Sequence, residues 1–288
     1  MRLGLGTVQF GLDYGISNAA GRTPGDEVGR ILDCGRQAGI DTLDTAAAYG
    51  DSERILGEAG VAGWSVVSKV PPLPDDSVDG RAWVVDHVYR SLSRLRIDRL
   101  NGLLLHNADD MLKAQGPSIA AGLREVKAEG LVDKIGYSIY SPQPLPELLD
   151  AMSVDLIQAP FNVLDQRLVT TGWLGQLVDA GVEVHVRSIF LQGLLLLGRD
   201  QRPAYFDRWN PIWRRWDALV GECGGSALSH CLGFAKAQPG ISRIIVGVES
   251  RLHLEQLLAT WKGAVSMPGT DLSSDDLLLI EPSNWQTK

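Results

Sequence analysis

The sequence predicts a single-domain (β/α)8 TIM barrel with an extra C-terminal helix. Eight short apolar runs alternate with amphipathic segments of helical period. This alternation implies parallel strands with crossover helices, and eight such units within about 250 residues fit a closed barrel. The alternative, an open doubly wound sheet, usually carries a glycine-rich turn after a strand. Here Gly4-x-Gly6 is followed by Gln9 at the third glycine position, so that fingerprint fails.

The predicted strands are short runs rich in Val, Ile and Leu, each bounded by turn residues. They span residues 2–6, 40–44, 65–69, 100–105, 134–138, 154–158, 182–186 and 244–247.

The predicted helices follow from apolar residues spaced three and four apart. Thr23-Pro24 indicates the start of the first helix, as an N-cap and a proline at the first helical position, and Gly39 indicates its end. Later helices are expected over residues 52–58, 84–95, 119–128, 145–151, 168–180, 211–237 and 252–261. Residues 273–276 resemble a cap for the extra helix, which is expected over residues 271–280.

Composition limits the class of protein. The chain has 288 residues, is 44% hydrophobic and shows no linker, so we expect one domain over residues 1–288. The net charge of −8 gives no indication of a nucleic-acid partner. Cys34, Cys223 and Cys231 form no metal-binding spacing and suit a reducing compartment. The N-terminus lacks a signal-peptide core, and the longest aliphatic block, residues 194–197, is too short to span a membrane. We therefore expect a cytoplasmic protein with no membrane partner and no bound metal.

Polar residues end or follow five consecutive predicted strands. They are Asp44, Lys69, His106, Ser138 and Gln158. The carboxyl ends of barrel strands meet at one mouth, where barrel enzymes place their catalytic residues. One polar residue after a strand is common, but five in succession indicate a functional site.

A tyrosine lies on the loop after Asp44, in the run Asp-Thr-Ala-Ala-Ala-Tyr-Gly-Asp-Ser-Glu of residues 44–53, and Leu56-Gly57 follows. This run resembles the active-site loop of bacterial aldo-keto reductases, D-T-A-x-x-Y-G-x-S-E-x-x-L-G, at every fixed position. The resemblance covers nearly the whole chain, from Gly6-Thr7 to residues 252–255. It implies reversible NAD(P)H-dependent reduction of an aldehyde or ketone, sugars included. It also implies a catalytic tetrad, which would consist of Asp44, Tyr49, Lys69 and His106.

The four residue types suit that reaction. Hydride addition builds negative charge on the carbonyl oxygen, and a proton must be delivered there. Free tyrosine has a pKa of about 10, which we expect the Lys69 ammonium to lower. Asp44 can pair with Lys69, and His106 can donate a hydrogen bond to the same oxygen. The hydride must come from a cofactor, because no side chain can donate one.

Each residue alone also has a structural interpretation. Tyr49 could be a surface residue, Lys69 and Asp44 a structural ion pair, and His106 a core histidine; the joint pattern favours catalysis. The remaining histidines are interpreted as structural or surface residues. They are His87, His185, His230 and His253.

The resemblance also implies a cofactor site. Ser138 and Gln158 match the family's nicotinamide-amide ligands, whereas Ile139 stands in place of the family's asparagine. Asn162 completes the family's pattern after strand six. Arg187 replaces the stacking aromatic residue after strand seven; its planar group can stack on a ring, and its charge could lie near the substrate. The full set of implied cofactor residues is Gly6, Thr7, Asp44, Ser138, Gln158, Arg187, Ser188, Phe190, Gln192, Gly193, Val246, Gly247, Glu249 and Arg251.

The choice between NADP(H) and NAD(H) depends on residues 245–250, which resemble the family's phosphate turn I-P-G-x-x-S. A glycine and backbone amides at a helix N-terminus suit a phosphate. Glu249 stands where many NADPH-preferring members carry a basic residue. A carboxylate repels a 2′-phosphate and can bind a 2′-hydroxyl, which favours NAD(H). Arg251 could compensate, and Glu249 could equally be an ordinary acidic residue at a helix start.

Two other functions stay open on sequence alone. A nucleotide-binding regulatory protein on the same barrel, like the potassium-channel β subunits of the family, is compatible with Arg187. Another barrel enzyme could use Lys69 in a Schiff base, or His106 with Asp44 at a metal. Neither of these enzymes explains the Tyr49–Glu53 run.

The aromatic residues of the Gly198–Trp216 stretch have two interpretations: they pack helices together, or they form a lid or wall at the mouth. Phe10, Trp83, Tyr140 and Trp173 could also line the mouth. The partner expected from the resemblance is a small carbonyl substrate, and the oligomeric state stays open.

Overall fold

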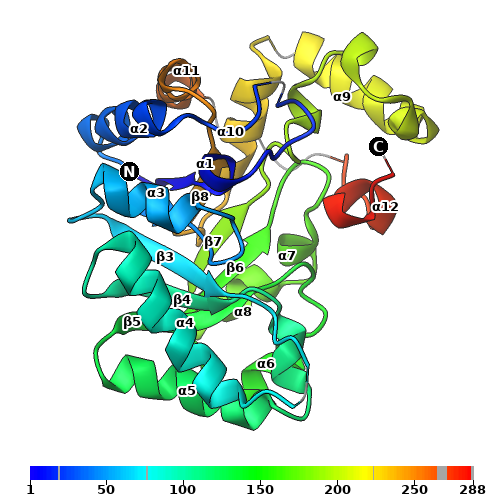
Figure 1. The fold of residues 1–288 in the computed structure, drawn as a ribbon. Coiled ribbons are helices and arrows are strands. Elements are labelled where there is room, and N and C mark those ends of the chain that lie inside the picture. The colour runs from blue at the N-terminus through cyan, green and yellow to red at the C-terminus, as the bar shows by residue number, and fades with distance from the viewer. Residues whose placement is uncertain (19, 76, 223, 265–270, 287–288) are drawn as a thin grey trace.

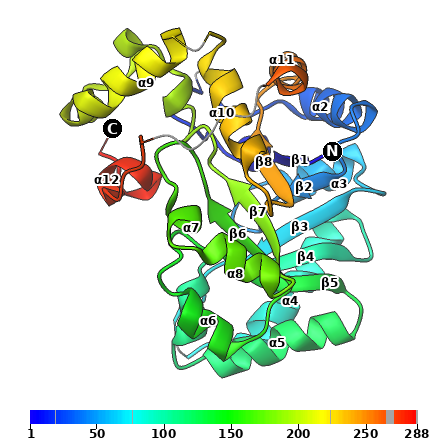
Figure 2. The same ribbon diagram turned by 180° about the vertical axis from the view of Figure 1, so that it is seen from behind.

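Eight parallel strands close into a barrel in the computed structural model, which describes residues 1–18, 20–75, 77–222, 224–264 and 271–286. The strands follow chain order around the barrel, and β8 pairs with β1. Figures 1 and 2 show helices covering the outside of the barrel from two opposite directions. This closure confirms the predicted fold class. The strands are β1 (Leu3–Gly6), β2 (Thr42–Asp44), β3 (Ser65–Val70), β4 (Leu100–Leu105), β5 (Val132–Ser138), β6 (Leu156–Pro160), β7 (Glu183–Arg187) and β8 (Arg243–Gly247).

Helices lie between the strands along the chain. The α-helices are α1 (Val8–Gly11), α2 (Gly25–Gln37), α3 (Ser52–Ala59), α4 (Gly80–Leu95), α5 (Gly116–Ala128), α6 (Leu145–Ala151), α7 (Arg167–Thr170), α8 (Trp173–Asp179), α9 (Asn210–Glu222), α10 (Ala227–Ala237), α11 (Arg251–Gly263) and α12 (Leu277–Ile280). The 3-10 helices are η1 (Ala108–Leu112), η2 (Leu194–Leu196), η3 (Arg199–Gln201), η4 (Ala204–Trp209) and η5 (Pro282–Asn284). Within the described residues, we find no helix with the length and apolar character needed to cross a membrane.

Two long predicted helices are each divided in the structure, so those predictions were wrong. The expected helix over residues 211–237 is α9 and α10, separated where Gly224 and Gly225 adopt φ angles of 68° and 98°. Ser226 then caps α10 by accepting a hydrogen bond from the Ser229 amide. The expected helix over residues 168–180 is α7 and α8, separated by Gly172 with φ 80°. Left-handed glycines end helices because they lack a Cβ.

The C-terminal helix exists but is shorter than predicted. Instead of residues 271–280 it covers only α12, and the Asp276 side chain caps it by accepting from the Leu278 amide. The segment before α12 takes another partner: the Ser274 amide donates to the Leu164 carbonyl of the loop after β6 at 2.8 Å. The helix α4 begins four residues and α5 three residues before the predicted start, and most other boundaries differ by a residue or two. α2 begins at Gly25, with Pro24 as its N-cap residue, and the short helix α1 was not predicted.

The barrel interior holds a small apolar cluster of its own, Val67 on β3, Leu104 on β4 and Leu156 on β6. The larger core lies outside it, in contact with the helices. Gly136 on β5 permits the close approach of β6, because a Cβ there would lie 1.7 Å from the Leu156 carbonyl oxygen. These packed layers place every strand's carboxyl end at one rim.

The aromatic stretch packs against the C-terminal segment, which supports the packing interpretation over a lid. Phe206, Trp213 and Trp216 are almost fully buried. The Tyr205 hydroxyl donates to the Leu278 carbonyl at 3.0 Å, and the Phe206 ring meets Trp285 edge to face.

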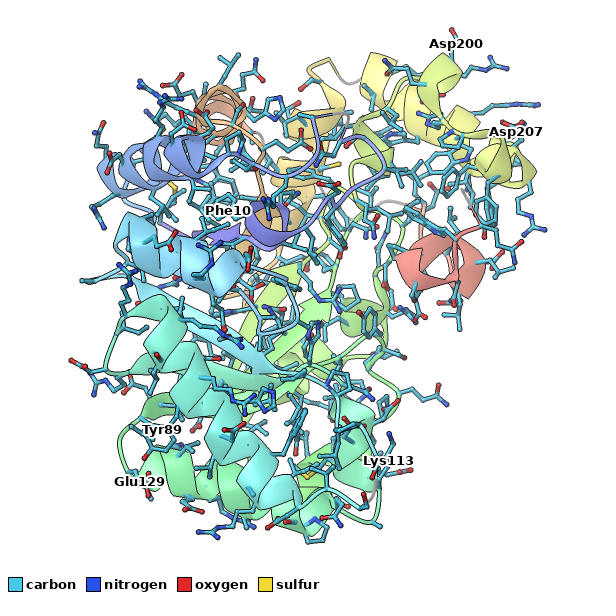
Figure 3. All side chains as sticks on the ribbon, viewed as in Figure 1. Phe10, Tyr89, Lys113, Glu129, Asp200 and Asp207 are labelled. Atoms are coloured by element: carbon cyan, nitrogen blue, oxygen red, sulfur yellow. The ribbon has the colours of Figure 1, made fainter. Side chains whose placement is uncertain are left out.

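Of the other four aromatic residues that could line the mouth, three pack inside the protein or against its core. Phe10, a residue of α1 (Figure 3), is completely buried, so the expectation that it lines the mouth was wrong. Trp83 packs against His87, with ring centroids 4.1 Å apart, and Trp173 packs against the core. Tyr140 alone of these four is exposed, at 45%.

Candidate active site

The predicted tetrad comes from three neighbouring strands and the loop between two of them. Asp44 is the last residue of β2, Lys69 lies one residue before the end of β3, and His106 follows β4 directly. Tyr49 lies on the turn that joins β2 to α3. The structure therefore brings the four side chains together at the carboxyl-end rim, as the strand-end pattern predicts.

A buried ion pair forms the base of this cluster. The Lys69 ammonium, whose residue is 1% exposed, donates to the two Asp44 carboxylate oxygens at 2.7 and 2.8 Å. Its third hydrogen bond goes to the Thr45 carbonyl at 3.0 Å. Asp44 also accepts from the Gln158 amide nitrogen at 2.6 Å. An ammonium with three acceptors is satisfied in an apolar interior, where an unpaired charge would be very costly.

Tyr49 and His106 lie against this ion pair. The Lys69 nitrogen lies 5.1 Å from the centre of the Tyr49 ring. The rings of Tyr49 and His106 meet edge to face, with centroids 5.6 Å apart. The phenol, the imidazole and the ammonium are therefore close enough to act on one substrate atom.

The rest of the Asp44–Gly57 run holds the tyrosine loop in place. The Ser52 hydroxyl donates to Thr7, and Thr45 lies 3.1 Å from the same hydroxyl. Gly50 adopts φ 55°, and a Cβ there would lie 2.6 Å from the Gly11 carbonyl oxygen. Glu53 accepts from Ser68 at 2.6 Å inside the protein. These contacts give the motif residues around Tyr49 a structural role in holding the loop.

The electrostatics of Tyr49 differ from the sequence-based expectation. Burial raises the pKa of the Tyr49 hydroxyl well above its ordinary value, and the Asp44 carboxylate raises it further. The Arg187 guanidinium acts in the opposite direction. Lys69 is paired with Asp44 at contact distance. The pKa of Tyr49 is therefore raised, where the expectation from the sequence was a lowered one, and Tyr49 is protonated at neutral pH.

Burial and neighbouring cations act in the same direction on the two nitrogen bases. Burial, together with the charges of Lys69 and Arg187, lowers the pKa of His106 to about 4. The imidazole is therefore neutral at pH 7 and carries one N–H. Burial also lowers the pKa of Lys69, while the Asp44 carboxylate opposes that change.

The four histidines outside the predicted tetrad have local partners. His185 lies 2.8 Å from Glu183. This contact and the Lys134 ammonium lower the pKa of the Glu183 carboxyl to about 2. The other contacts are between His87 and the Trp83 carbonyl, His230 and the Ser226 carbonyl, and His253 and Glu249.

The nicotinamide residues implied by the resemblance lie next to the ion pair. Ser138 and Gln158 are register partners on β5 and β6. The Gln158 side chain donates its amide hydrogen to Asp44, and its carbonyl oxygen is buried without a hydrogen-bond partner. A buried polar atom normally has a partner, and a carboxamide N–H2 would supply one. The site therefore fits a nicotinamide amide at Gln158.

The β1 and β8 ends supply the neighbouring backbone. Gly6 lies between Asp44 and Gly247 in the sheet. Thr7 and Val246 are buried, and the Thr7 hydroxyl donates to the Asp44 carbonyl at 3.0 Å. Gln9, which was not predicted, lies over Gly247, and its side-chain oxygen is a second buried acceptor without a partner.

The loop after β7 has an unusual backbone. Ser188, Leu191 and Gln192 are not glycines, yet they have φ angles of 60°, 48° and 54°. Non-glycine residues at positive φ are strained and cluster at functional sites. Asn162 supports the loop by donating to the Ser188 carbonyl at 3.1 Å. Gly193 adopts φ 89° and packs closely against Ser17.

The predicted adenosine end carries more negative charge than the sequence indicated. Glu249 is mostly buried, and burial raises its pKa. The Arg251 side chain donates to Glu255 at 2.7 Å, while its backbone amide donates to Glu27 at 2.7 Å. Glu27 lies in the first turn of α2. Its contact with α11 depends on the packing of two helices far apart in sequence.

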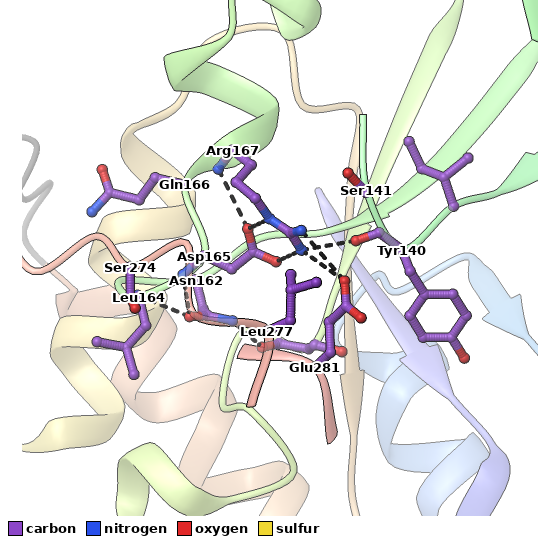
Figure 4. A network of polar contacts seen from close by, with 12 residues as sticks. Tyr140, Ser141, Asn162, Leu164, Asp165, Gln166, Arg167, Ser274, Leu277 and Glu281 are labelled. Atoms are coloured by element: carbon purple, nitrogen blue, oxygen red, sulfur yellow. Dashed lines mark hydrogen bonds and ion pairs between the residues drawn. The ribbon is translucent and has the colours of Figure 1, made fainter. Parts of the chain in front are cut away.

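A polar network not predicted from the sequence ties the C-terminal segment to the rim (Figure 4). Arg167 forms ion pairs with Asp165 at 2.8 Å and Glu281 at 3.3 Å. It also donates to the Tyr140 carbonyl at 2.9 Å. This network fixes the backbone of Tyr140 beside the site.

A phenol beside a neutral imidazole and a paired ammonium can protonate a carbonyl oxygen as a hydride reaches the carbon, which is the chemistry of carbonyl-reducing oxidoreductases. Comparison with known proteins identifies one family of such enzymes. The family model described as "Aldo/keto reductase family" matches residues 2–266, and the chain belongs to that family. The predicted resemblance is therefore confirmed at the level of the family.

Individual proteins show the same relationship. An NADH-specific methylglyoxal reductase of Escherichia coli K12 is 28% identical over 214 residues. That match spans 64% of this chain and 62% of the relative's length. A protein of Pseudomonas aeruginosa with a solved structure is 25% identical, with a TM-score of 0.67 over 91% of this chain and 90% of that chain. The aldo-keto reductase AKR11C1 of Bacillus halodurans, in its holo form, has the same fold. It has a TM-score of 0.71 at 22% identity, over 93% of this chain and 88% of that chain.

Proposed function

We propose that this protein reduces a small aldehyde or ketone with Tyr49 as the proton donor and NADH as the preferred cofactor. The observation that carries the proposal is the satisfied Lys69–Asp44 pair beneath Tyr49 and His106. A nicotinamide bound beside Gln158 would supply the hydride. The substrate carbonyl would then lie between that group and the Tyr49 hydroxyl.

The four side chains have separate roles in this proposal. His106 is neutral at pH 7 and donates its N–H to the carbonyl oxygen, which orients the carbonyl. Tyr49 is held protonated by burial, so that it enters the reaction as an acid. As negative charge grows on the oxygen, the Tyr49 proton moves to it. The Lys69 ammonium lies near the phenolate that remains and stabilises it, while Asp44 keeps Lys69 charged and in place.

The preference for NADH is supported by the charges near β8. Glu249 and Glu27 place two carboxylates at the start of α11, and Glu255 engages the guanidinium of Arg251. Arg251 is therefore poorly placed to compensate Glu249. A 2′-phosphate would meet repulsion there, whereas a ribose 2′-hydroxyl could donate to a carboxylate. The name of the Escherichia coli relative, an NADH-specific reductase, agrees with this preference.

Tyr49→Phe tests the proton donor. It removes one hydroxyl and keeps the ring that contacts His106. We expect kcat to fall about 100- to 10,000-fold, the range that general acid catalysis contributes. NADH affinity, measured by fluorescence titration, should change less than about threefold. A variant that keeps more than a tenth of the wild-type kcat would show that Tyr49 is not the acid.

Glu249→Arg tests the cofactor preference. NADH and NADPH are titrated in parallel into the wild-type protein and the variant, with quenching of tryptophan fluorescence as the signal. The wild type should bind NADH more tightly, and the variant should shift the ratio of the two Kd values toward NADPH by about tenfold or more. Arg251→Gln tests whether the neighbouring arginine contributes to the preference. It should leave the ratio nearly unchanged, because Glu255 already engages that arginine. A ratio that does not move in Glu249→Arg would refute the role of Glu249.

A further inference from the structure

One cation beside the active site has no acidic partner. Arg187 ends β7 and is half-buried, yet among the described residues no carboxylate pairs with its guanidinium. The mostly buried Arg167 has two such carboxylates, and Arg202 has Asp217. A half-buried charge without a partner is costly, so it is normally retained for a ligand.

The guanidinium is held in a fixed orientation by neutral groups. One nitrogen donates to the Ile139 carbonyl at 3.1 Å, and another donates to the Ser188 hydroxyl at 3.3 Å. The Tyr140 ring lies under the guanidinium carbon at 4.6 Å. The other N–H groups of the five on an arginine have no partner among the described residues. The side chain is thus rigid, charged and still able to bind.

Its support extends to the C-terminal segment. Arg167 donates to the Tyr140 carbonyl and is itself held by Asp165 and Glu281 (Figure 4). The aromatic ring beneath Arg187 is therefore fixed at its backbone by a network that lies away from the catalytic residues. Such a support reduces the entropy lost when a ligand binds.

Arg187 lies at the rim that carries the predicted tetrad, because it is the last residue of β7 and the barrel brings the carboxyl ends of its strands together. Its charge opposes the burial that raises the pKa of Tyr49, and it adds to the burial that lowers the pKa values of Lys69 and His106. The Lys69–Asp44 pair is neutral and His106 is uncharged at pH 7. The cluster therefore keeps one uncompensated positive charge, in a chain whose net charge is −8.

A second donor lies against the loop that follows Arg187. It is Tyr14, a residue 38% exposed on the loop after α1. The Tyr14 hydroxyl accepts from Gln192 at 3.1 Å, which leaves its own proton available to donate. A planar guanidinium with a phenol hydroxyl suits an oxyanion.

We propose that Arg187 and Tyr14 form an anion subsite beside the catalytic cluster, and that the natural substrate is an aldehyde or ketone bearing a carboxylate or phosphate group. This inference deepens the proposed carbonyl reduction and rests on it. Arg187 determines specificity: it binds the anionic end of the substrate and thereby places the carbonyl between Tyr49 and the cofactor. The alternative role is a contact with the cofactor, since Arg187 reaches Ile139, where the family has an asparagine.

The test compares substrates that differ only in charge. The full chain is assayed with 3- and 4-carboxybenzaldehyde and with their methyl esters, under saturating NADH. Glyceraldehyde 3-phosphate against glyceraldehyde distinguishes phosphate from carboxylate. The measured quantity is the ratio of kcat/KM for the anionic and the neutral member of each pair. This ratio cancels any effect of a substitution on cofactor binding or on the pKa of Tyr49.

The wild type should favour the anionic member of at least one pair. Arg187→Gln should lower that ratio about 10- to 100-fold, the effect of a lost charged hydrogen bond. Arg187→Lys should retain part of it, and Tyr14→Phe should lower it about threefold to tenfold. Arg54→Gln, an exposed arginine on α3, makes the same change in net charge and should leave the ratio unchanged. An unchanged ratio in Arg187→Gln, with NADH affinity lowered more than tenfold, would overturn the proposal and assign Arg187 to the cofactor.

Binding separates this inference from the proposed function. Calorimetry with the NADH-loaded protein measures the Kd values of 4-(hydroxymethyl)benzoate and of its methyl ester, two alcohols that NADH cannot reduce. Turnover of the neutral esters without a charge preference would overturn the anion subsite and leave the reductase intact. Absence of turnover on every carbonyl, with anion binding that Arg187→Gln abolishes, would refute the proposed reaction and support the subsite.

Discussion

Replacing Asp44 with asparagine tests the ion pair on which the active site is built. The substitution keeps the side-chain shape and removes one charge. It leaves the Lys69 ammonium, in a residue 1% exposed, without the carboxylate that accepts two of its hydrogen bonds. Breaking a buried pair on one side typically costs about 3–5 kcal/mol. The polar partner Gln158 keeps an acceptor in the asparagine oxygen, so the loss should arise mainly from Lys69.

The ordinary pKa of lysine sets an upper limit on that loss. Lys69 can escape an unpaired charge by releasing its proton, which costs about 4.6 kcal/mol at pH 7 for an ordinary pKa of about 10.4. At pH 9 the same release costs only about 1.9 kcal/mol. The unfolded chain keeps its lysine protonated and the folded variant does not. The stability of the variant should therefore rise with pH relative to the wild type.

Urea unfolding followed by circular dichroism at pH 7 and pH 9 measures both effects. We expect a loss of about 3–4.6 kcal/mol at pH 7 that shrinks toward about 2 kcal/mol at pH 9. The double variant with Lys69→Met should be more stable than Asp44→Asn alone, because both charges are then gone. Glu58→Gln, in an exposed pair with Arg54 at 2.8 Å, is the control and should cost less than about 1 kcal/mol. A loss below about 1 kcal/mol for Asp44→Asn at pH 7, or one that grows with pH, would refute this reasoning.

Three further tests, two of them with a control variant, address other parts of the molecule. His106 has its pKa lowered from 6.5 to about 4 in the folded state, so wild-type stability should fall by up to about 3 kcal/mol as pH drops through that interval. His106→Gln should keep most of this stability in urea unfolding at pH 4.5. Gly136→Ala should cost more than about 2 kcal/mol because its Cβ would lie 1.7 Å from a β6 carbonyl. At Gly175 on α8 a Cβ would meet open space, so Gly175→Ala should be neutral or stabilising; thermal melts of the two variants measure both effects. Arg167→Met leaves a buried aspartate unpaired (Figure 4) and should cost about 3–5 kcal/mol, whereas Glu281→Gln should cost about 1 kcal/mol in the same assay.

Much of the candidate site could be predicted because its signals are local in the chain. Asp44, Lys69 and His106 each follow an apolar run, and parallel strands must bring their carboxyl ends to one rim. The tyrosine motif identified Tyr49 in the same way. What this reasoning missed was the effect of burial, which raises the pKa of Tyr49 although two cations, Lys69 and Arg187, belong to the site. Burial and distance decide such an effect, and neither can be read from residue order.

The helix errors have a similar cause. The glycines at 172, 224 and 225 were visible in the sequence, but apolar periodicity continues across each of them. Their left-handed backbone ended the helices in each case. The C-terminal helix shortened because Ser274 took a partner in the loop after β6, a contact between residues more than a hundred positions apart.

The barrel, the family and the strand-end positions of Asp44, Lys69 and His106 could be predicted from the sequence, because strand and helix periods and a contiguous motif depend on neighbours in the chain. The contacts around these residues form only in the folded protein. The fold places Glu27 on the amide of Arg251, Tyr140 under Arg187, and the C-terminal Glu281 on Arg167. These contacts join loops and helices that are distant in the chain. They form only when the closed barrel brings the loops to one rim, so no local pattern could announce them.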